Sequence, residues 1–350
     1  MKILVLNAGS SSLKYKLYAM EAMDVIAAGV IEDIPQGGYH TALQEVERQL
    51  QESGLETLAA LDAIGHRVVH GGERFKHSVV IDESVIEAIR TLIPLAPLHN
   101  PANLEGIMIA RSHAPQVPQV AVFDTAFHQE MPPHAYRYAL PEALYSEMGI
   151  RRYGFHGTSH HFVAKEAAAI LGKRLEDTRL ITLHLGNGAS ICAVEGGRSI
   201  DTTMGFTPLE GLVMGSRSGD IDPAILFYLA REEGYTIDQL DTLLNRQSGL
   251  QGLCGEHDMR RIHQRIAQGD ARAALAHRIF CYRIRKYIGA YVAILGRVDA
   301  LVFTGGIGEN DTITRDAITK ELPFDLRVMT VATDEELEIA LQTQQICMQG

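Results

Sequence analysis

The chain has 350 residues, of which 46% are hydrophobic and 21% are charged, and 32 Lys and Arg against 43 Asp and Glu give a formal net charge of −11. This length favours two domains over one, and the acidic balance argues against binding to nucleic acid. The sequence has no apolar stretch long enough to cross a membrane, and its four cysteines lack the spacing of a disulfide framework or a metal site. We therefore expect a cytoplasmic protein that binds neither nucleic acid nor a membrane.

The first predicted element is a hairpin. An apolar strand at 3–6 leads into a turn of small residues at 7–12, and alternating apolar residues from 13 to 17 predict a second strand. The same order recurs as a strand at 181–185, a glycine-containing turn at 186–190 and a strand at 191–194. Two such copies indicate a duplicated α/β fold with a cleft between the copies.

Further strands and helices follow each hairpin. The strands at 120–125 and 300–306 both end in polar turns, and we expect them to be counterparts in the two copies. Asn100 before Pro101 predicts the cap of one helix. Asp270 and Gly296 bound a longer helix, whose apolar positions begin at Leu275 and keep helical spacing.

Both hairpin turns suit the binding of phosphate. Turns rich in glycine and hydroxyl residues expose backbone N–H groups that can surround phosphate oxygens, and Lys14 adds a positive charge beside the first turn. The alternative is a plain tight turn. Neither turn has the P-loop spacing, and the segment 306–311 is not the glycine pattern of a dinucleotide fold.

Arginines and histidines complete the pattern. Arg67 and Arg217 lie in glycine-rich segments, where a guanidinium can bind carboxylate or phosphate through two oxygens. His99 and His156 each precede a predicted helix, whose N-terminus favours an anion, although either histidine could instead bond its own loop. Zinc is not favoured, because no third-ligand motif accompanies His156. Together these groups predict phosphoryl transfer.

In several segments the sequence resembles the acetate kinase family. The segments that carry the resemblance are 7–14, 65–72, 97–101, 123–128, 154–160, 184–188, 204–211, 217–223 and 305–310. The resemblance implies two ribonuclease H-like domains of the actin and hsp70 type, formed by 1–128 with 337–350 and by 129–336. It also implies a homodimer that phosphorylates acetate to acetyl phosphate with ATP and Mg²⁺ or Mn²⁺.

The resemblance further implies residue roles. Arg67 and Arg217 would hold the acetate carboxylate and the migrating phosphoryl group. His156 would stabilise the transition state with support from His99, and Asp124 would face the metal and the phosphoryl group. The residues implied to surround the acetate methyl group are Val69, Leu98, Phe155 and Pro208. Those implied to contact ATP are Ser10, Ser12, Lys14, His184, Asn187, Gly188, Asp258, Met259, Arg260, Gly306, Ile307 and Asn310. Those implied to serve the metal are Asn7 and Glu335.

The chain is shorter than is usual for this family, and the shortfall falls between Lys14 and Arg67 and between Asn310 and Glu335. If the second shortening displaced Glu335, the metal site would be incomplete. The alternatives are a propionate or butyrate kinase, an enzyme that uses pyrophosphate, a catalytically impaired nucleotide-binding homologue, and an actin-like or hsp70-like module. Acetate is preferred, because propionate kinases tend to carry a smaller residue where Val69 stands.

Overall fold

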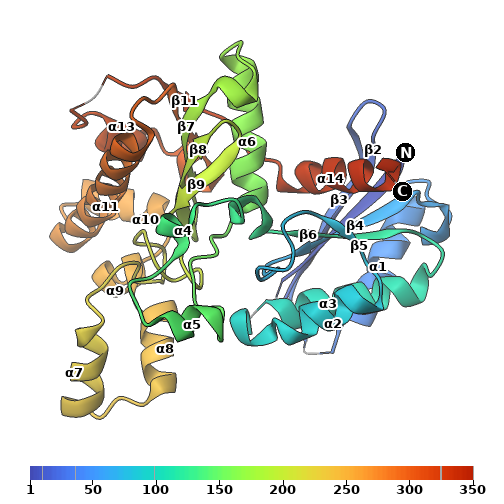
Figure 1. Ribbon diagram of the computed structural model, residues 1–350, viewed down its shortest axis with the longest axis horizontal. Coiled ribbons are helices and arrows are strands. Elements are labelled where there is room, and N and C mark those ends of the chain that lie inside the picture. Colours follow the sequence, from blue (N-terminus) through green and yellow to red (C-terminus); the bar gives the residue numbers. More distant parts are fainter. Residues whose placement is uncertain (10, 36, 98, 324, 350) are drawn as a thin grey trace. The chain divides into compact units, whose positions relative to one another are not determined.

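The computed structural model describes residues 1–9, 11–35, 37–97, 99–323 and 325–349, and the chain divides into two compact units. Unit 1 comprises Met1–Gln129, Gly157–Phe162 and Asp334–Gly350, and unit 2 comprises Glu130–His156 and Val163–Thr333. The limits expected from the sequence assign Gln129, 157–162 and 334–336 to the other domain. The unit 1 elements, coloured in Figure 1 mainly from blue to cyan with α14 in red, are β1 (Lys2–Ala8), β2 (Leu13–Ala19), β3 (Asp24–Ile31), α1 (Tyr39–Glu52), η1 (Leu58–Ala60), β4 (Ala63–Val68), β5 (Val79–Val80), α2 (Glu83–Thr91), η2 (Ile93–Leu95), α3 (Asn100–His113), β6 (Gln119–Phe123), η3 (Ala126–His128) and α14 (Glu335–Gln349).

The sheet of unit 1 has the strand order β3-β2-β1-β4-β6-β5. β1 pairs with β2, and β2 with β3, in antiparallel fashion, whereas β1, β4 and β6 run parallel. The carboxyl ends of these parallel strands therefore meet at one edge of the sheet, where α/β folds commonly place their ligands.

Helices cover both faces of this sheet. Because side chains alternate along a strand, Ile3 and Val5 of β1 pack with Ile339 of α14, while Leu4 and Leu6 pack with the core shared by α1 and α3. Figure 1 shows α14 on one side of the sheet and α1, α2 and α3 on the other.

The elements of unit 2 are α4 (Pro133–Tyr136), α5 (Glu142–Ser146), α6 (Gly157–Ile170, in this unit from Val163), η4 (Leu175–Asp177), β7 (Arg179–Leu185), β8 (Ala189–Glu195), β9 (Arg198–Thr202), α7 (Ala224–Glu232), α8 (Ile237–Arg246), α9 (Gly249–Cys254), α10 (Met259–Ala267), α11 (Ala271–Leu295), β10 (Ala300–Thr304), α12 (Gly305–Asn310), α13 (Thr312–Thr319) and β11 (Val328–Thr330). The sheet order is β11-β10-β7-β8-β9. β7, β8 and β9 are antiparallel, and β7, β10 and β11 are parallel.

The two sheets confirm the predicted duplication. In each, three antiparallel strands are followed by two parallel strands that add beside the first, which is the ribonuclease H-like arrangement. The prediction that the strands at 120–125 and 300–306 are counterparts was wrong, however. By position in the sheet, β10 corresponds to β4, and β6 corresponds to β11. β6 and β10 are both buried strands of five residues, so their patterns do not distinguish the two positions in the sheet.

The predicted start of α3 was wrong by one residue. His99 occupies the cap position and Asn100 is the first helical residue. The Asn100 side chain instead forms hydrogen bonds with the backbone of His70.

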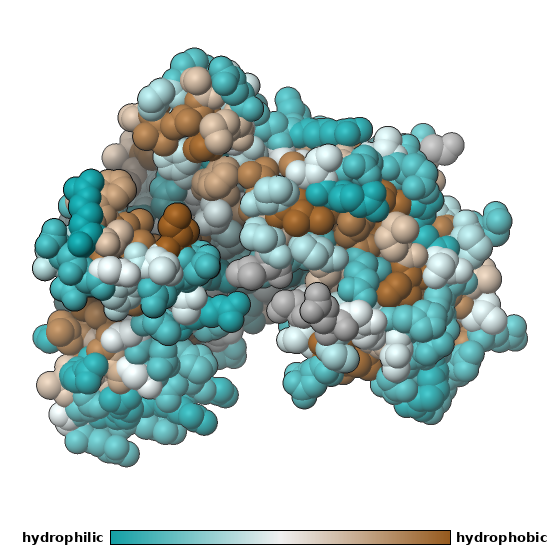
Figure 2. Space-filling view, turned by 90° about the horizontal axis from the view of Figure 1, so that it is seen from below, coloured by the Kyte–Doolittle hydropathy of each residue, from teal (hydrophilic) through white to brown (hydrophobic). Residues whose placement is uncertain are grey.

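No helix among the described residues is long and apolar enough to cross a membrane. On the face shown in Figure 2, hydrophobic residues form small groups separated by hydrophilic ones.

Candidate active site

In unit 1, neighbouring parallel strands bring an arginine and an aspartate together. Arg67 lies near the end of β4, and Asp124 directly follows β6. Arg67 Nε donates to Oδ1 and Oδ2 of Asp124 at 3.0 and 3.1 Å, and Nη2 donates to Oδ2 at 2.6 Å. The Asp124 side chain is 1% exposed, so the pair is shielded from water and the guanidinium is held in one orientation.

Asn7 and Glu335 lie beside this ion pair. Asn7, in β1, accepts a hydrogen bond from Arg67 Nη1 through Oδ1 at 3.2 Å. Glu335 begins α14, and its carboxyl group interacts electrostatically with Arg67 and Asp124. Burial raises the pKa of Glu335 to about 7, Arg67 opposes the rise, and the Asp124 and Glu336 carboxylates add to it. The shortened stretch before Glu335 therefore does not remove this residue from the cluster.

The side-chain oxygens of Asn7, Asp124 and Glu335 could supply some, but not all, of the ligands of a hard divalent cation. Among the described residues, no group of three or more His, Cys, Asp or Glu side chains is arranged to hold a metal by itself. Mg²⁺ commonly takes only one or two carboxylates and completes its coordination with water and substrate phosphate. Asn7, Asp124 and Glu335 suit that partial kind of site.

Two asparagines for which the sequence predicted no role in the site fix the segment after β4. Asn103 accepts from the Val69 N–H at 3.0 Å and donates to the Ala8 carbonyl at 2.6 Å. Asn100 accepts from the His70 N–H and donates to the His70 carbonyl, both at 3.1 Å. Both amides are buried on α3. The sequence signal that could have revealed these contacts is the presence of two asparagines on the core face of a predicted helix. Buried amides need hydrogen-bond partners.

The other unit 1 candidates occupy the loops around these strands. His99 precedes α3. The Gly9 N–H donates to the Ser12 carbonyl at 2.8 Å and closes the β1–β2 turn, and Lys14 is exposed on β2. Two of the predicted residues, Ser10 and Leu98, lie outside the described residues.

In unit 2, His156 lies against the β7–β8 hairpin. It precedes α6 in a left-handed conformation, with φ of 58°. Its Nδ1 is 2.9 Å from Ser190 Oγ, and its ring stacks on His184 with 4.2 Å between centroids. His184 and Ser190 are paired across the hairpin, so the hairpin orients the His156 ring.

Arg217 lies beside the turn of the same hairpin. Its Nη1 donates to the Pro208 carbonyl at 3.2 Å, and no carboxylate pairs with Arg217 in the part of the chain that the structure describes. Burial lowers the pKa of Arg217. A Cβ placed on Gly188 would lie 3.6 Å from His156 Nε2 and 3.7 Å from Arg217 Nη1. The turn therefore touches a histidine and a guanidinium that suit an anion.

A pocket of about 690 Å³ opens on the other side of this turn. It is lined by Gly186, Asn187, His257, Asp258, Met259, Arg260, His263, Gly306, Ile307, Asn310 and Asp311. Seven of these residues are among those implied to contact ATP: Asn187, Asp258, Met259, Arg260, Gly306, Ile307 and Asn310. A Cβ on Gly306 would meet no atom within 4 Å, which leaves the pocket open at that position.

Local capping shapes the pocket walls. The Asp258 side chain caps α10 by accepting from the Arg260 N–H at 2.9 Å. His263 Nε2 is 2.7 Å from Asp311 Oδ2, and Asp311 also caps α13. His263 and Asp311 were not predicted as site residues, because their pairing joins segments that are far apart in the chain.

The two residues of unit 2 that were predicted to surround the acetate methyl group differ in exposure. Phe155 is 2% exposed, whereas Pro208 is half-buried and offers its carbonyl to Arg217. Pro208 is thus both a predicted wall of the acetate site and a hydrogen-bond partner of the Arg217 guanidinium.

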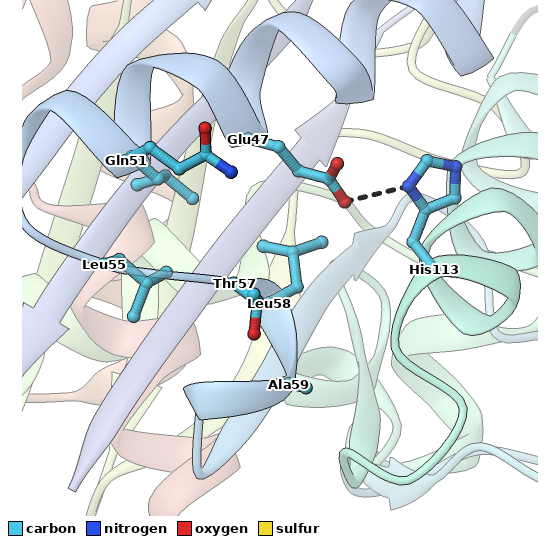
Figure 3. A pocket seen from close by; sticks show the side chains of 8 residues that line it. Glu47, Gln51, Leu55, Thr57, Leu58, Ala59 and His113 are labelled. Carbon is cyan, nitrogen blue, oxygen red and sulfur yellow. Dashed lines mark hydrogen bonds and ion pairs between the residues drawn. The ribbon is translucent and has the colours of Figure 1, made fainter.

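A separate hollow of about 250 Å³ in unit 1 contains none of the predicted site residues. As Figure 3 shows, Glu47 and His113 face each other across one side of it, with 2.8 Å between Glu47 Oε1 and His113 Nδ1. Leu55 and Leu58 line the rest together with polar groups of the chain. Glu47 and His113 thus form a half-buried pair that contacts none of the predicted site residues in this hollow.

Comparison with known proteins gives a consistent assignment. The family model described as "Acetokinase family" matches residues 32–348. An acetate kinase of Sulfurovum sp. is 49% identical over 393 aligned positions, which cover 99% of both chains. Because this alignment is longer than 350 residues, the relative carries insertions that this chain lacks.

Solved structures agree. The crystal structure of Porphyromonas gingivalis acetate kinase matches with a TM-score of 0.92 and 42% identity, and a propionate kinase from Francisella tularensis matches with a TM-score of 0.94 and 42% identity. Each comparison covers 99% of both chains.

Proposed function

The chain belongs to the acetokinase family and is a kinase, and from that premise we propose that it transfers the γ-phosphoryl group of ATP reversibly to acetate, forming acetyl phosphate and ADP. One observation carries the proposal. The β7–β8 turn joins the 690 Å³ pocket, through Gly186 and Asn187, to Arg217 and His156, through Gly188. A nucleotide base in the pocket and its phosphates at the turn would therefore reach both cationic groups.

The proposed chemistry needs no general base. A small carboxylic acid has a pKa of about 4 to 5, similar to that of Asp or Glu, so acetate is already ionised at neutral pH. A carboxylate oxygen bonds to the γ-phosphorus while the bond from phosphorus to the bridging oxygen of ADP breaks. Positioning and charge stabilisation then account for most of the catalysis.

In this proposal the two arginines have different tasks. Arg217, which lacks a carboxylate partner among the described residues, neutralises the migrating phosphoryl group together with His156. Arg67, held by Asp124, binds the acetate carboxylate. His99 supports the site from the start of α3. We propose direct in-line transfer, and a phosphoenzyme trapped on Asp124 or Glu335 without acetate would contradict it.

The proposed cation is Mg²⁺ or Mn²⁺, with Asn7 and Glu335 as its protein ligands and Asp124 nearby. When bound, the ion would neutralise phosphate charge. The chain's own contribution is to hold the oxygen donors around Arg67, whose hydrogen bonds to Asn7 and Asp124 set their positions.

We propose that the residues implied by the sequence bind the ATP phosphates and the acyl group. His184, Asn187, Gly188 and the β1–β2 turn with Lys14 are proposed for the phosphates. Val69, Phe155 and Pro208 are proposed to surround the acetate methyl group. We also propose that the enzyme acts as a homodimer.

A second candidate, propionate as the preferred acceptor, is favoured by the similarity to a propionate kinase. One methylene group changes binding by only about 1–3 kcal/mol, so some activity on propionate is expected in either case.

The test is to incubate the protein with MgATP and acetate, propionate or butyrate, and to trap the acyl phosphate with hydroxylamine. We expect acetyl hydroxamate in excess, with loss of product in Arg217→Ala. A preference for propionate would favour the second candidate. If the protein forms no product from any acid but still binds ADP, it is a catalytically impaired homologue. Pyrophosphate replaces ATP in a parallel reaction and should give no product.

A further inference from the structure

Arg152 is enclosed by the segment that leads to Pro208. Its Nη1 donates to the carbonyl oxygens of Thr202, Thr203 and Met204 at 2.9, 3.0 and 3.2 Å. Its Nη2 donates to Glu210 Oε1 at 2.6 Å. The guanidinium therefore bonds both the beginning and the end of the segment 202–210, and its side chain is only 15% exposed.

Tyr138 holds the other oxygen of Glu210. The Tyr138 hydroxyl donates to Glu210 Oε2 and accepts from the Phe206 N–H at 2.9 Å, so its single proton and a lone pair are both used. Gly205 packs directly against this pair, since a Cβ there would lie 1.7 Å from Glu210 Oε2 and 2.2 Å from Tyr138 Oη. The segment has no room to shift toward these side chains.

The same segment contacts groups proposed for the reaction. The N–H groups of Tyr153 and Gly154, which precede Phe155 and His156, lie 3.0 and 3.3 Å from the Gly205 carbonyl. At the far side, the Pro208 carbonyl accepts from Arg217. Arg152 itself contacts none of the groups proposed to touch substrate in these hydrogen bonds.

We propose that Arg152, together with Glu210 and Tyr138, is a positioning residue that sets the place of Pro208 and Arg217 and thereby the affinity for acetate and the preference for acyl length. This inference rests on the proposed function. An arginine suits the role because its planar fork spans several carbonyls and a carboxylate at once, which a lysine ammonium cannot do in the same geometry.

The principal variant is Arg152→Lys, which keeps the charge and loses the fork. We expect KM for acetate to rise about tenfold and the ratio of kcat/KM for acetate to that for propionate to change by about threefold or more, because small displacements at a reacting site are costly. KM for ATP should stay within about twofold, since the 690 Å³ pocket contains none of these residues. Circular dichroism and ADP binding by calorimetry report whether unit 2 is folded.

Two milder variants support the test. Glu210→Gln and Tyr138→Phe each remove one contact of the cluster, and both should shift the acetate to propionate ratio in the same direction as Arg152→Lys. The double variant Arg152→Lys with Glu210→Gln should be non-additive, since the two groups act through one contact. If Arg152→Lys fails to fold, the ratio of kcat/KM for acetate to that for propionate in Tyr138→Phe tests the proposal instead.

The matched controls are Arg179→Lys and Glu47→Gln. Arg179 also donates to a backbone carbonyl, that of Leu295 at 2.8 Å, and pairs with Glu195 at 2.5 Å, at the other end of β7 from His184. Glu47 forms the half-buried pair with His113 (Figure 3). Both controls should leave KM for acetate and the acid preference unchanged.

Several outcomes would overturn the inference. A folded Arg152→Lys enzyme with the wild-type KM for acetate and the wild-type acid ratio would do so, even if kcat fell equally for both acids. A wild-type protein without acyl kinase activity on any acid would instead refute the proposed function, and the inference with it.

Discussion

At the scale of single residues, Arg67 and Arg217 have opposite electrostatic surroundings. Burial disfavours the charge of Arg67, but the carboxylates of Asp124 and Glu335 outweigh it and raise the pKa of Arg67. Burial lowers the pKa of Arg217, which has no such partner among the described residues. One guanidinium is thus fixed in place with its charge compensated, and the other retains charge for an incoming anion. This difference supports separate roles for the two.

His66 makes stability depend on pH. It is 3% exposed in β4, and burial lowers its pKa to about 4, only partly opposed by Gln119 at 2.8 Å. The unfolded chain protonates this histidine near pH 6.5, so it binds more protons than the folded chain between about pH 6.5 and 4. We expect the free energy of unfolding to fall by about 3 kcal/mol across that range because of His66. Urea unfolding at closely spaced pH values measures it.

The comparison variants separate this effect from general acid sensitivity. His66→Gln should flatten the slope between pH 6.5 and 4, whereas the exposed His77→Gln should leave it unchanged. His70, whose pKa burial also lowers to about 4, keeps part of the slope in both variants. Equal slopes in wild type and His66→Gln would contradict the prediction.

At the scale of elements, the β7–β8 turn is the part on which the proposed phosphate site depends. Gly188 does not adopt a left-handed backbone conformation, and a Cβ there would be in ordinary contact with His156 and Arg217. Gly188→Ala should therefore fold, while its methyl group occupies space proposed for phosphate. We expect KM for ATP to rise about tenfold. Steady-state kinetics with varied MgATP measures the change.

Gly289→Ala is the control for this variant. Gly289 lies in α11, where a Cβ would meet no atom within 4 Å, so alanine should be neutral or slightly stabilising. An unchanged KM for ATP in Gly188→Ala, with the fold intact, would exclude this turn from phosphate binding.

The hairpins were predictable because their signals are local. Alternation of apolar residues and a glycine-containing turn are recognised within about ten residues. β7 ends at Leu185 as expected, and β8 begins at Ala189, two residues before its expected start. The caps of α11 at Asp270 and Gly296 are equally local and are confirmed.

Packing over longer distances was not predictable in the same way. Leu275 was expected in the apolar stripe of α11 but is 50% exposed, while Ala276, His277 and Phe280 are buried. Helical spacing defines several possible stripes, and only the tertiary contacts select one. The Arg152 cluster depends on the same kind of long-range contact and carried no sequence signal.

At the scale of the whole molecule, shortening has left both sheets complete in their strand order. The alignment with the Sulfurovum relative needs 393 positions for a chain of 350 residues. Nevertheless, Glu335 stays in the cluster of Arg67 and Asp124. The strand order of the described sheets and the cluster of Arg67, Asp124 and Glu335 therefore form without the additional residues of that relative.

A hydrophobic surface on unit 2 bears on the proposed homodimer. None of the residues of α7 or α8, all of which the structure describes, is buried. These helices nevertheless carry large apolar side chains: Phe227 and Tyr228 of α7 are 58% and 59% exposed, and Ile237 of α8 is 84% exposed. Helices this short are marginally stable without packing, and a patch of large apolar side chains commonly marks an interface.

We expect the protein to be a dimer at micromolar concentration and the pair of changes Ile225→Glu and Tyr228→Glu to shift it toward monomer by at least about tenfold in the dissociation constant. These residues are three apart on α7 and therefore share a face, so two buried like charges would oppose association. Sedimentation equilibrium measures the constant. Met348→Glu, at a 74% exposed position of α14, is the control and should not change it. A monomeric wild-type protein would contradict the homodimer, whereas a dimer unaffected by the pair of changes would place its interface away from α7.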